Sequence, residues 1–87
     1  MANTKSAEKR IRQNEERRQR NRAKRSAMRT AVKKLRAAVA AGDAATAQEL
    51  LPATLQTIDK TAQKGVIHDN AAARYKSRLT KAVHGLS

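Results

Sequence analysis

The sequence contains no cysteine, tryptophan or phenylalanine, and its 87 residues include only one tyrosine, one proline and three glycines. The absence of cysteine excludes disulfides and thiolate metal sites. The shortage of proline and glycine, together with few runs of β-branched residues, favours helices over a β-sheet. We therefore predict an all-α protein.

Residues that perform chemistry are also scarce. His68 and His84 are the two histidines, and no thiol is present as a nucleophile. His68 is followed by Asp69, but neighbours at a helix start face different ways, and no third ligand or nucleophile accompanies them. We predict that the protein is not an enzyme and that it has no cofactor, metal or small-molecule substrate.

Long apolar runs are missing. The N-terminal stretch MANTKSAEKR has no apolar segment of the kind found in secretory signals, and no segment approaches the length needed to span a bilayer. We expect a cytoplasmic protein.

Acidic residues are few: 7 Asp and Glu stand against 20 Lys and Arg, for a net charge of +13. The excess is concentrated in residues 1–36, which have 14 basic and 3 acidic side chains, whereas residues 37–87 have 6 and 4. A chain with this asymmetry repels itself and is expected to bind a polyanion. Nucleic acid and an anionic membrane are the two candidates.

The first predicted helix covers residues 5–41, a span without glycine or proline, and Asn3, Thr4 and Ser6 are candidate N-caps. Its apolar side chains recur at helical spacing only from residue 27 onward. This predicted buried stripe consists of Ala27, Met28, Ala31, Val32, Leu35, Ala38 and Val39.

Gly42 and Asp43 are typical of a helix end followed by an N-cap, and Lys64 and Gly65 end the second predicted helix. Pro52 lies inside that helix, where we expect a kink or a short break. The predicted buried face of this helix is Ala47, Leu51, Leu55, Ile58 and Ala62, with Leu50 beside it.

In the connection VIHDN, Val66 and Ile67 are expected in the core, and His68, Asp69 or Asn70 caps a third helix that ends near Gly85. The predicted buried face of the third helix is Ala71, Tyr75, Leu79, Ala82 and Val83.

The short connections imply antiparallel neighbours. The prediction is one domain, residues 1–87, in which a three-helix bundle of residues 27–87 bears a long basic helical arm, residues 1–26.

The basic residues of the first helix form a stripe beside its apolar face, spaced by three and four. The members of this stripe are Arg18, Arg22, Arg25, Arg29, Lys33 and Arg36. In the third helix Arg74, Arg78 and Lys81 repeat the spacing, whereas the second helix has mixed charges. We expect the first and third helices to face the polyanion.

A membrane-bound helix needs a broad apolar face, and residues 12–22 contain no apolar side chain. The run RNRAKRSAMR is similar to a leucine-zipper basic region, but Leu35 is followed one heptad later by Gly42, so no zipper continues. Base stacking by a single-strand binder requires exposed aromatics, and the spacing of Tyr75 predicts that it is in the core. Structured RNA held by its phosphates fits best; a general DNA-compacting protein is the alternative.

Four motifs resemble one known family in order and spacing: ANTKSAEKR at 2–10, RSAMRTAVKK at 25–34, AGD at 41–43 and KGVIHDNAAARYKSRLTKA at 64–82. The sequence is similar to the family of the bacterial small-subunit ribosomal protein numbered twenty, over essentially the whole chain. The resemblance implies a three-helix bundle in the cytoplasmic ribosome that binds small-subunit ribosomal RNA directly, helps its assembly, and has other small-subunit proteins as possible neighbours.

The predicted RNA-binding set consists of residues chosen from the matched positions, the basic stripe and the arm. These residues are Lys5, Lys9, Arg10, Arg17, Arg18, Arg22, Arg25, Arg29, Lys33, Lys34, Lys64, His68, Asn70, Arg74, Lys76 and Arg78.

Overall fold

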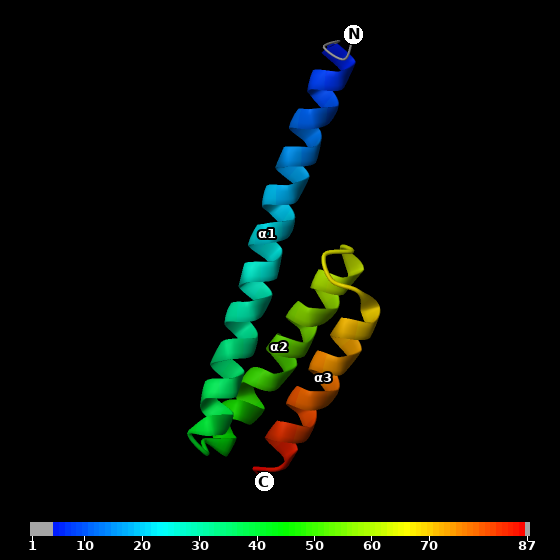
Figure 1. Cartoon of the computed structure of the whole chain (residues 1–87). Helices are drawn as coiled ribbons and strands as arrows, with labels where there is room; N and C mark the ends of the chain where they lie inside the picture. Colours follow the sequence, from blue (N-terminus) through cyan, green and yellow to red (C-terminus); the bar gives the residue numbers. More distant parts are fainter. Residues whose placement is uncertain (1–4, 87) are drawn as a thin grey trace.

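The computed structural model describes residues 5–86, and within them the chain forms three α-helices and no strand. These are α1 (Lys5–Ala40), α2 (Ala44–Gln63) and α3 (Asp69–His84). Consecutive helices run in opposite directions, as Figure 1 shows. The predictions of an all-α fold and of a three-helix bundle with a long first helix are confirmed. Of the candidate N-caps of α1, Asn3 and Thr4 lie outside the described residues, and Ser6 lies inside the helix.

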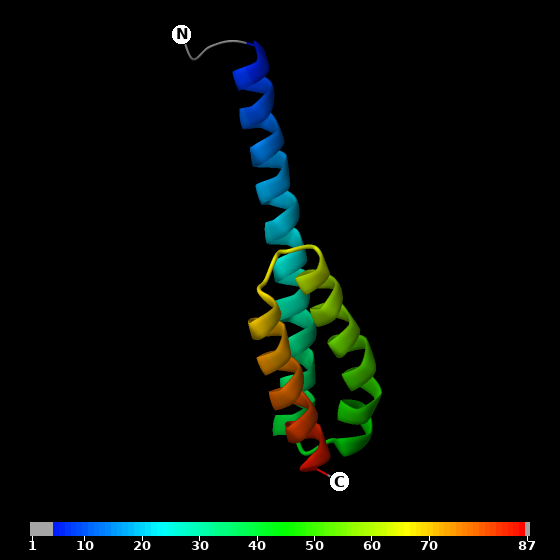
Figure 2. The same cartoon turned by 90° about the vertical axis from the view of Figure 1, so that its right-hand side faces the viewer.

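The first half of α1 projects beyond the bundle. No residue from 5 to 27 is buried, and the first buried side chain of α1 is Met28. The molecule measures 63 × 20 × 15 Å and has a radius of gyration of 17.6 Å, against about 12 Å for a compact domain of this length. Figure 2 shows α1 continuing alone above the loop that joins α2 to α3. We call residues 5–26 the arm.

The connection between α1 and α2 has the predicted glycine at the end of α1 and the predicted N-cap of α2. Gly42 adopts a φ of +73°, in the left-handed region that glycine accepts without strain. Asp43 then caps α2: its carboxylate accepts a 2.6 Å hydrogen bond from the Thr46 hydroxyl and a 3.2 Å bond from the Thr46 N–H. The bond from the hydroxyl, and to a lesser extent the bond from the N–H, holds the pKa of the Asp43 carboxyl below its usual value.

Pro52 does not break α2, which is continuous from Ala44 to Gln63. Proline removes one backbone donor, so the carbonyl of Gln48 loses its partner in the helix. Both Pro52 and Gln48 are exposed, so water can reach that carbonyl, and the remaining helical bonds are kept. The short break considered from the sequence is therefore wrong.

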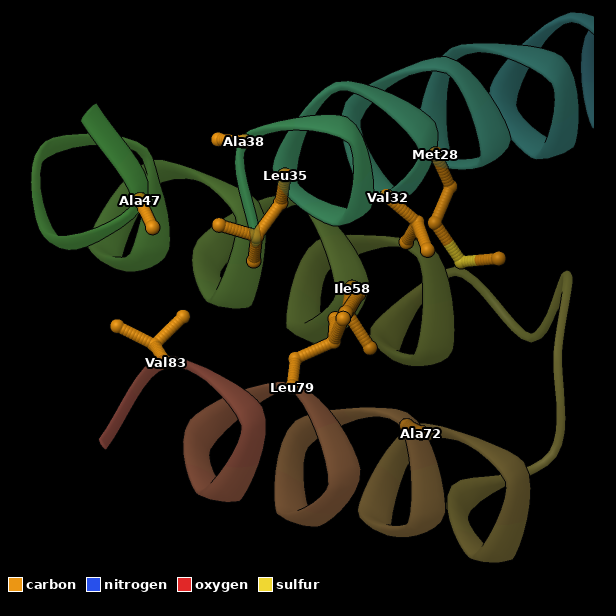
Figure 3. Packing of buried hydrophobic residues seen from close by; sticks show 9 residues of the cluster. All are labelled: Met28, Val32, Leu35, Ala38, Ala47, Ile58, Ala72, Leu79 and Val83. Atoms are coloured by element: carbon orange, nitrogen blue, oxygen red, sulfur yellow. The ribbon is translucent and has the colours of Figure 1, made fainter. Parts of the chain in front are cut away.

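The core lies where the three helices meet. In Figure 3, Val32 and Leu35 of α1 point toward the bundle interior, where Ile58 of α2 and Leu79 of α3 face one another. The cluster of buried apolar residues is Met28, Val32, Leu35, Ala38, Ala47, Ile58, Ala72, Leu79 and Val83. Val66, in the loop after α2, is also buried, and Ile67 packs against the cluster, as predicted.

The buried face of α2 is turned toward α1 relative to the prediction. Thr54 and Thr61 are buried, whereas Leu51 and Leu55 are only half-buried. The threonines tolerate burial because their hydroxyls donate to backbone carbonyls one turn earlier, at 2.9 Å to Leu50 and 2.7 Å to Thr57.

Other predicted core positions also differ. Ala31, Val39, Ala62 and Ala71 are only half-buried, and Ala72 is buried in place of Ala71.

Ala27, Ala82 and Tyr75 differ for separate reasons. Ala27 is exposed because it lines a surface hollow between α1 and α2. Ala82 is exposed in the last turn of α3, whereas the adjacent Val83 in the same turn is fully buried, so Ala82 lies outside the packed face of the helix. Tyr75 is half-buried: it packs against the core cluster but also lines the surface between α1 and α3.

Candidate nucleic-acid interface

Fifteen of the sixteen side chains in the predicted RNA-binding set are exposed, and Lys76 is half-buried. Exposure follows from the helical spacing, because these residues lie outside the apolar faces of α1 and α3. The structure groups most of them into three surfaces: a hollow on α1, a groove between α1 and α3, and the loop between α2 and α3.

The first surface is on the arm itself. An open hollow of about 540 Å³ runs along α1 and is lined by polar side chains alone. Its lining residues are Asn14, Arg17, Arg18, Asn21, Arg22 and Arg25. Arg18 lies 3.9 Å from Glu15, an exposed i,i+3 ion pair, and such a pair is weak enough to exchange for a phosphate. The arm therefore presents four guanidinium groups with the asparagine amides between them.

The second surface is the groove between α1 and α3, which we call the α1–α3 groove. Two adjoining hollows of about 370 and 240 Å³ share Arg36 and Tyr75. Their basic lining residues are Arg29, Lys33, Arg36, Arg74 and Arg78. Basic residues of the first and third helices therefore line one common groove; that this groove faces the polyanion stays a prediction. Arg36 was absent from the predicted set, although its place in the stripe of α1 identifies it.

The third surface is the loop between α2 and α3, beside the base of the arm. The Arg25 guanidinium donates a 3.3 Å hydrogen bond to the carbonyl of Val66, which ties this loop to α1. Gly65 has a φ of +73° and turns the chain so that His68 can cap α3. Exposed Lys64 and Asn70 flank the cap.

His68 presents a defined donor at this loop. Its Nδ1 accepts a 3.0 Å hydrogen bond from the N–H of Asn70, so Nδ1 carries no proton in this arrangement. A neutral imidazole then has its proton on Nε2. Because the ring is exposed, Nε2–H can donate to a phosphate oxygen or a base acceptor while Nδ1 keeps the helix capped.

Other members of the set lie apart from these surfaces. Lys34 lines the hollow between α1 and α2. Lys76 lies between α2 and α3, where its Nζ is 2.8 Å from Asp59 Oδ1. Lys5, Lys9 and Arg10 are exposed in the first turns of α1, farthest from the bundle.

The face between α2 and α3 has a different character. Asp59 and Asp69 line its hollow together with a single lysine, Lys76, so carboxylates outnumber cations there. Within residues 5–86, no group of three or more His, Asp or Glu side chains is arranged to hold a metal ion. None of the three described helices has a long enough apolar stretch to cross a membrane.

Comparison with known proteins identifies the family. The family model for ribosomal protein S20 matches residues 2–84. A small ribosomal subunit protein bS20 from Anaeromyxobacter dehalogenans is 57% identical over 82 residues, covering 94% of this chain and 89% of the relative. Proteins of the same name from Geobacter metallireducens (55%, 99% of both chains) and a Mycobacterium species (56%, 99% and 100%) are also similar. A match of this extent means that the chain belongs to the ribosomal protein S20 family.

Proposed function

We propose that this protein is a structural constituent of the small ribosomal subunit, where it binds small-subunit ribosomal RNA directly and helps it to fold and assemble. The observation that carries the proposal is the concentration of cations in the hollow on the arm and in the α1–α3 groove. These two surfaces have nine lysines and arginines and no carboxylate among their lining residues. Family membership supports the ribosomal setting in the cytoplasm, with other small-subunit proteins as neighbours.

The chemistry of the surface favours phosphate as its main partner. Arginine predominates, and its planar, forked donors suit bidentate contacts to phosphate oxygens. Phosphate contacts position a protein on a folded nucleic acid without reading each base. The sole aromatic side chain, Tyr75, is half-buried, so a row of stacking platforms for single strands is lacking in this chain.

The predicted division of the chain is a basic arm in residues 1–26 and a bundle in residues 27–87. In this division the arm becomes ordered when it binds RNA. Its described residues bury no side chain, and isolated helices without a packed face are marginal in water. Binding neutralises the repulsion between its arginines, which supplies the stabilisation that a protein core does not. The arm is therefore expected to be frayed in free protein and helical in the ribosome.

The alternative of a dimeric, zipper-like DNA protein is disfavoured by one observation. Leu35, which would have to lie in a dimer seam, has no exposed surface in the monomer because it is part of the bundle core. A general DNA-compacting role does not need a dimer, and it stays the competing hypothesis.

Chemical footprinting of small-subunit ribosomal RNA, free and with the purified protein, tests the proposal. We expect a few discrete protected stems that persist in excess competitor DNA and in excess polyuridine. Protection spread evenly along the RNA, or lost to an equal mass of duplex DNA, would contradict it.

A further inference from the structure

The α1–α3 groove contains more than positive charge. Its floor includes Met28 and Val32 of α1, two of the buried residues labelled in Figure 3, and Tyr75 of α3. The larger hollow, about 370 Å³, falls within the range of about 300–1,000 Å³ typical of small-molecule sites. A ligand that fits this groove needs a flat, apolar part for the floor as well as negative charge for the walls.

The tyrosine is accessible at the point where these features meet. Its hydroxyl has no hydrogen-bond partner among the described residues, yet every fully buried side-chain N or O atom in them has one. The hydroxyl must therefore reach the surface. Tyr75 also lines both hollows, so part of its ring borders the groove and is not enclosed by the core.

The charges around Tyr75 select an anion. Arg29, Lys33 and Arg36 stand on the α1 side, and Arg74 and Arg78 stand on the α3 side. No carboxylate is among the residues that line the groove; Asp59 and Asp69 line the hollow between α2 and α3, and Asp43 and Glu49 belong to the start of α2. Cations on two opposing walls, separated by an aromatic and aliphatic floor, match the chemistry of a nucleotide, whose base is flat and whose phosphates are charged.

We propose that one unpaired nucleotide of the bound RNA enters the α1–α3 groove, with its base against Tyr75 and its flanking phosphates on the basic residues of both walls. A paired base cannot do this, because its faces are covered by its neighbours in the stack. The ligand is therefore a bulged or loop nucleotide within an otherwise folded RNA. This inference rests on the proposed function for the identity of the RNA, and it changes the role expected for Tyr75 from a core residue to a base contact.

Because Tyr75 is the only tyrosine, a protein labelled with 3-fluorotyrosine has a single ¹⁹F NMR signal from the groove. We expect small-subunit ribosomal RNA to shift this signal through the ring current of the base, and inorganic polyphosphate to shift it much less. Polyphosphate supplies the phosphates without any base, so it separates the two contributions. An unchanged signal at saturating RNA, or an equal shift with polyphosphate, would overturn the proposal.

Two substitutions give an independent measurement. Tyr75→Leu keeps an apolar side chain against the core but removes the ring, and it should weaken RNA binding by about 5- to 150-fold, the range for one stacked base. Tyr75→Phe keeps the ring and should bind within a few-fold of the wild type. Wild-type affinity in Tyr75→Leu would refute the proposal; if that variant proves unstable, the NMR measurement on the wild-type sequence still decides.

Binding by the variants and footprinting with the wild-type protein together separate this inference from the proposed function. If the wild-type protein binds the RNA and Arg29→Ala weakens binding while Tyr75→Leu does not, the nucleotide site fails and the ribosomal role stands. If the wild-type protein does not protect discrete stems of small-subunit ribosomal RNA, the proposed function itself fails.

Discussion

Replacing two arginines of the arm, Arg18→Gln together with Arg22→Gln, should reduce both the affinity for small-subunit ribosomal RNA and its dependence on salt. Both side chains line the hollow on the arm and contribute nothing to the core, so folding should be unaffected. Each lost phosphate contact removes about 0.9 from the slope of log K against log salt for a duplex-like partner. Nine engaged cations predict a slope of about −8 for the wild type, and the double variant should give about −6.

The affinity gap between wild type and variant should itself depend on salt. Two contacts at about 0.9 each correspond to a gap of about 60-fold at 0.1 M salt and about 9-fold at 0.3 M. Filter binding over this range measures both quantities, and a thermal melt checks that the bundle is intact. A constant gap at all salt concentrations would show that the arginines act through something other than counterion release.

Lys60→Glu is the matched control. It also lowers the net charge by two, but Lys60 is exposed on α2 and lines neither the arm hollow nor the groove. Its slope should stay close to that of the wild type. If Lys60→Glu changes the slope as much as the double variant does, the total charge governs binding, and the assignment of a basic face is wrong.

Ile58→Ala should lower the free energy of unfolding by about 2–5 kcal/mol because Ile58 is fully buried. Leu55→Ala should lower it clearly less because Leu55 is half-buried. Equal losses of stability in urea denaturation would contradict the observed buried face of α2. Amides of residues 8–22 should exchange rapidly in free protein and become protected on RNA binding, and exchange as slow as that of residues 30–40 without RNA would argue against coupled folding. Asp43→Ala should be less stable than the wild type at neutral pH. The pKa of Asp43 is lowered by its bonds from Thr46, so this stabilisation is present above the ordinary carboxyl pKa and is lost as the pH falls through the folded-state pKa; a stability gap that is the same at pH 7 and pH 2 would refute it.

The sequence by itself determined the helices and their ends. Gly42, Asp43 and Gly65 act through their own backbone preferences and their nearest neighbours, so the boundaries could be predicted to within a residue or two. The basic stripe followed in the same way, because the angular spacing of side chains on a helix depends only on their separation in the chain. The same spacing also places Arg36 in the basic stripe of α1.

Only the tertiary structure decided which part of each apolar stripe is covered, because coverage depends on the directions from which the other helices approach. Thr54 and Thr61 are buried and Leu55 is not fully covered, since α1 packs on the threonine side of α2. Tyr75 shares the helical spacing of the core residues Leu79 and Val83, yet α1 and α3 leave a groove beside it. Periodicity cannot distinguish a side chain at the centre of a packed face from one at its rim, and here that difference separates a core tyrosine from a candidate base contact.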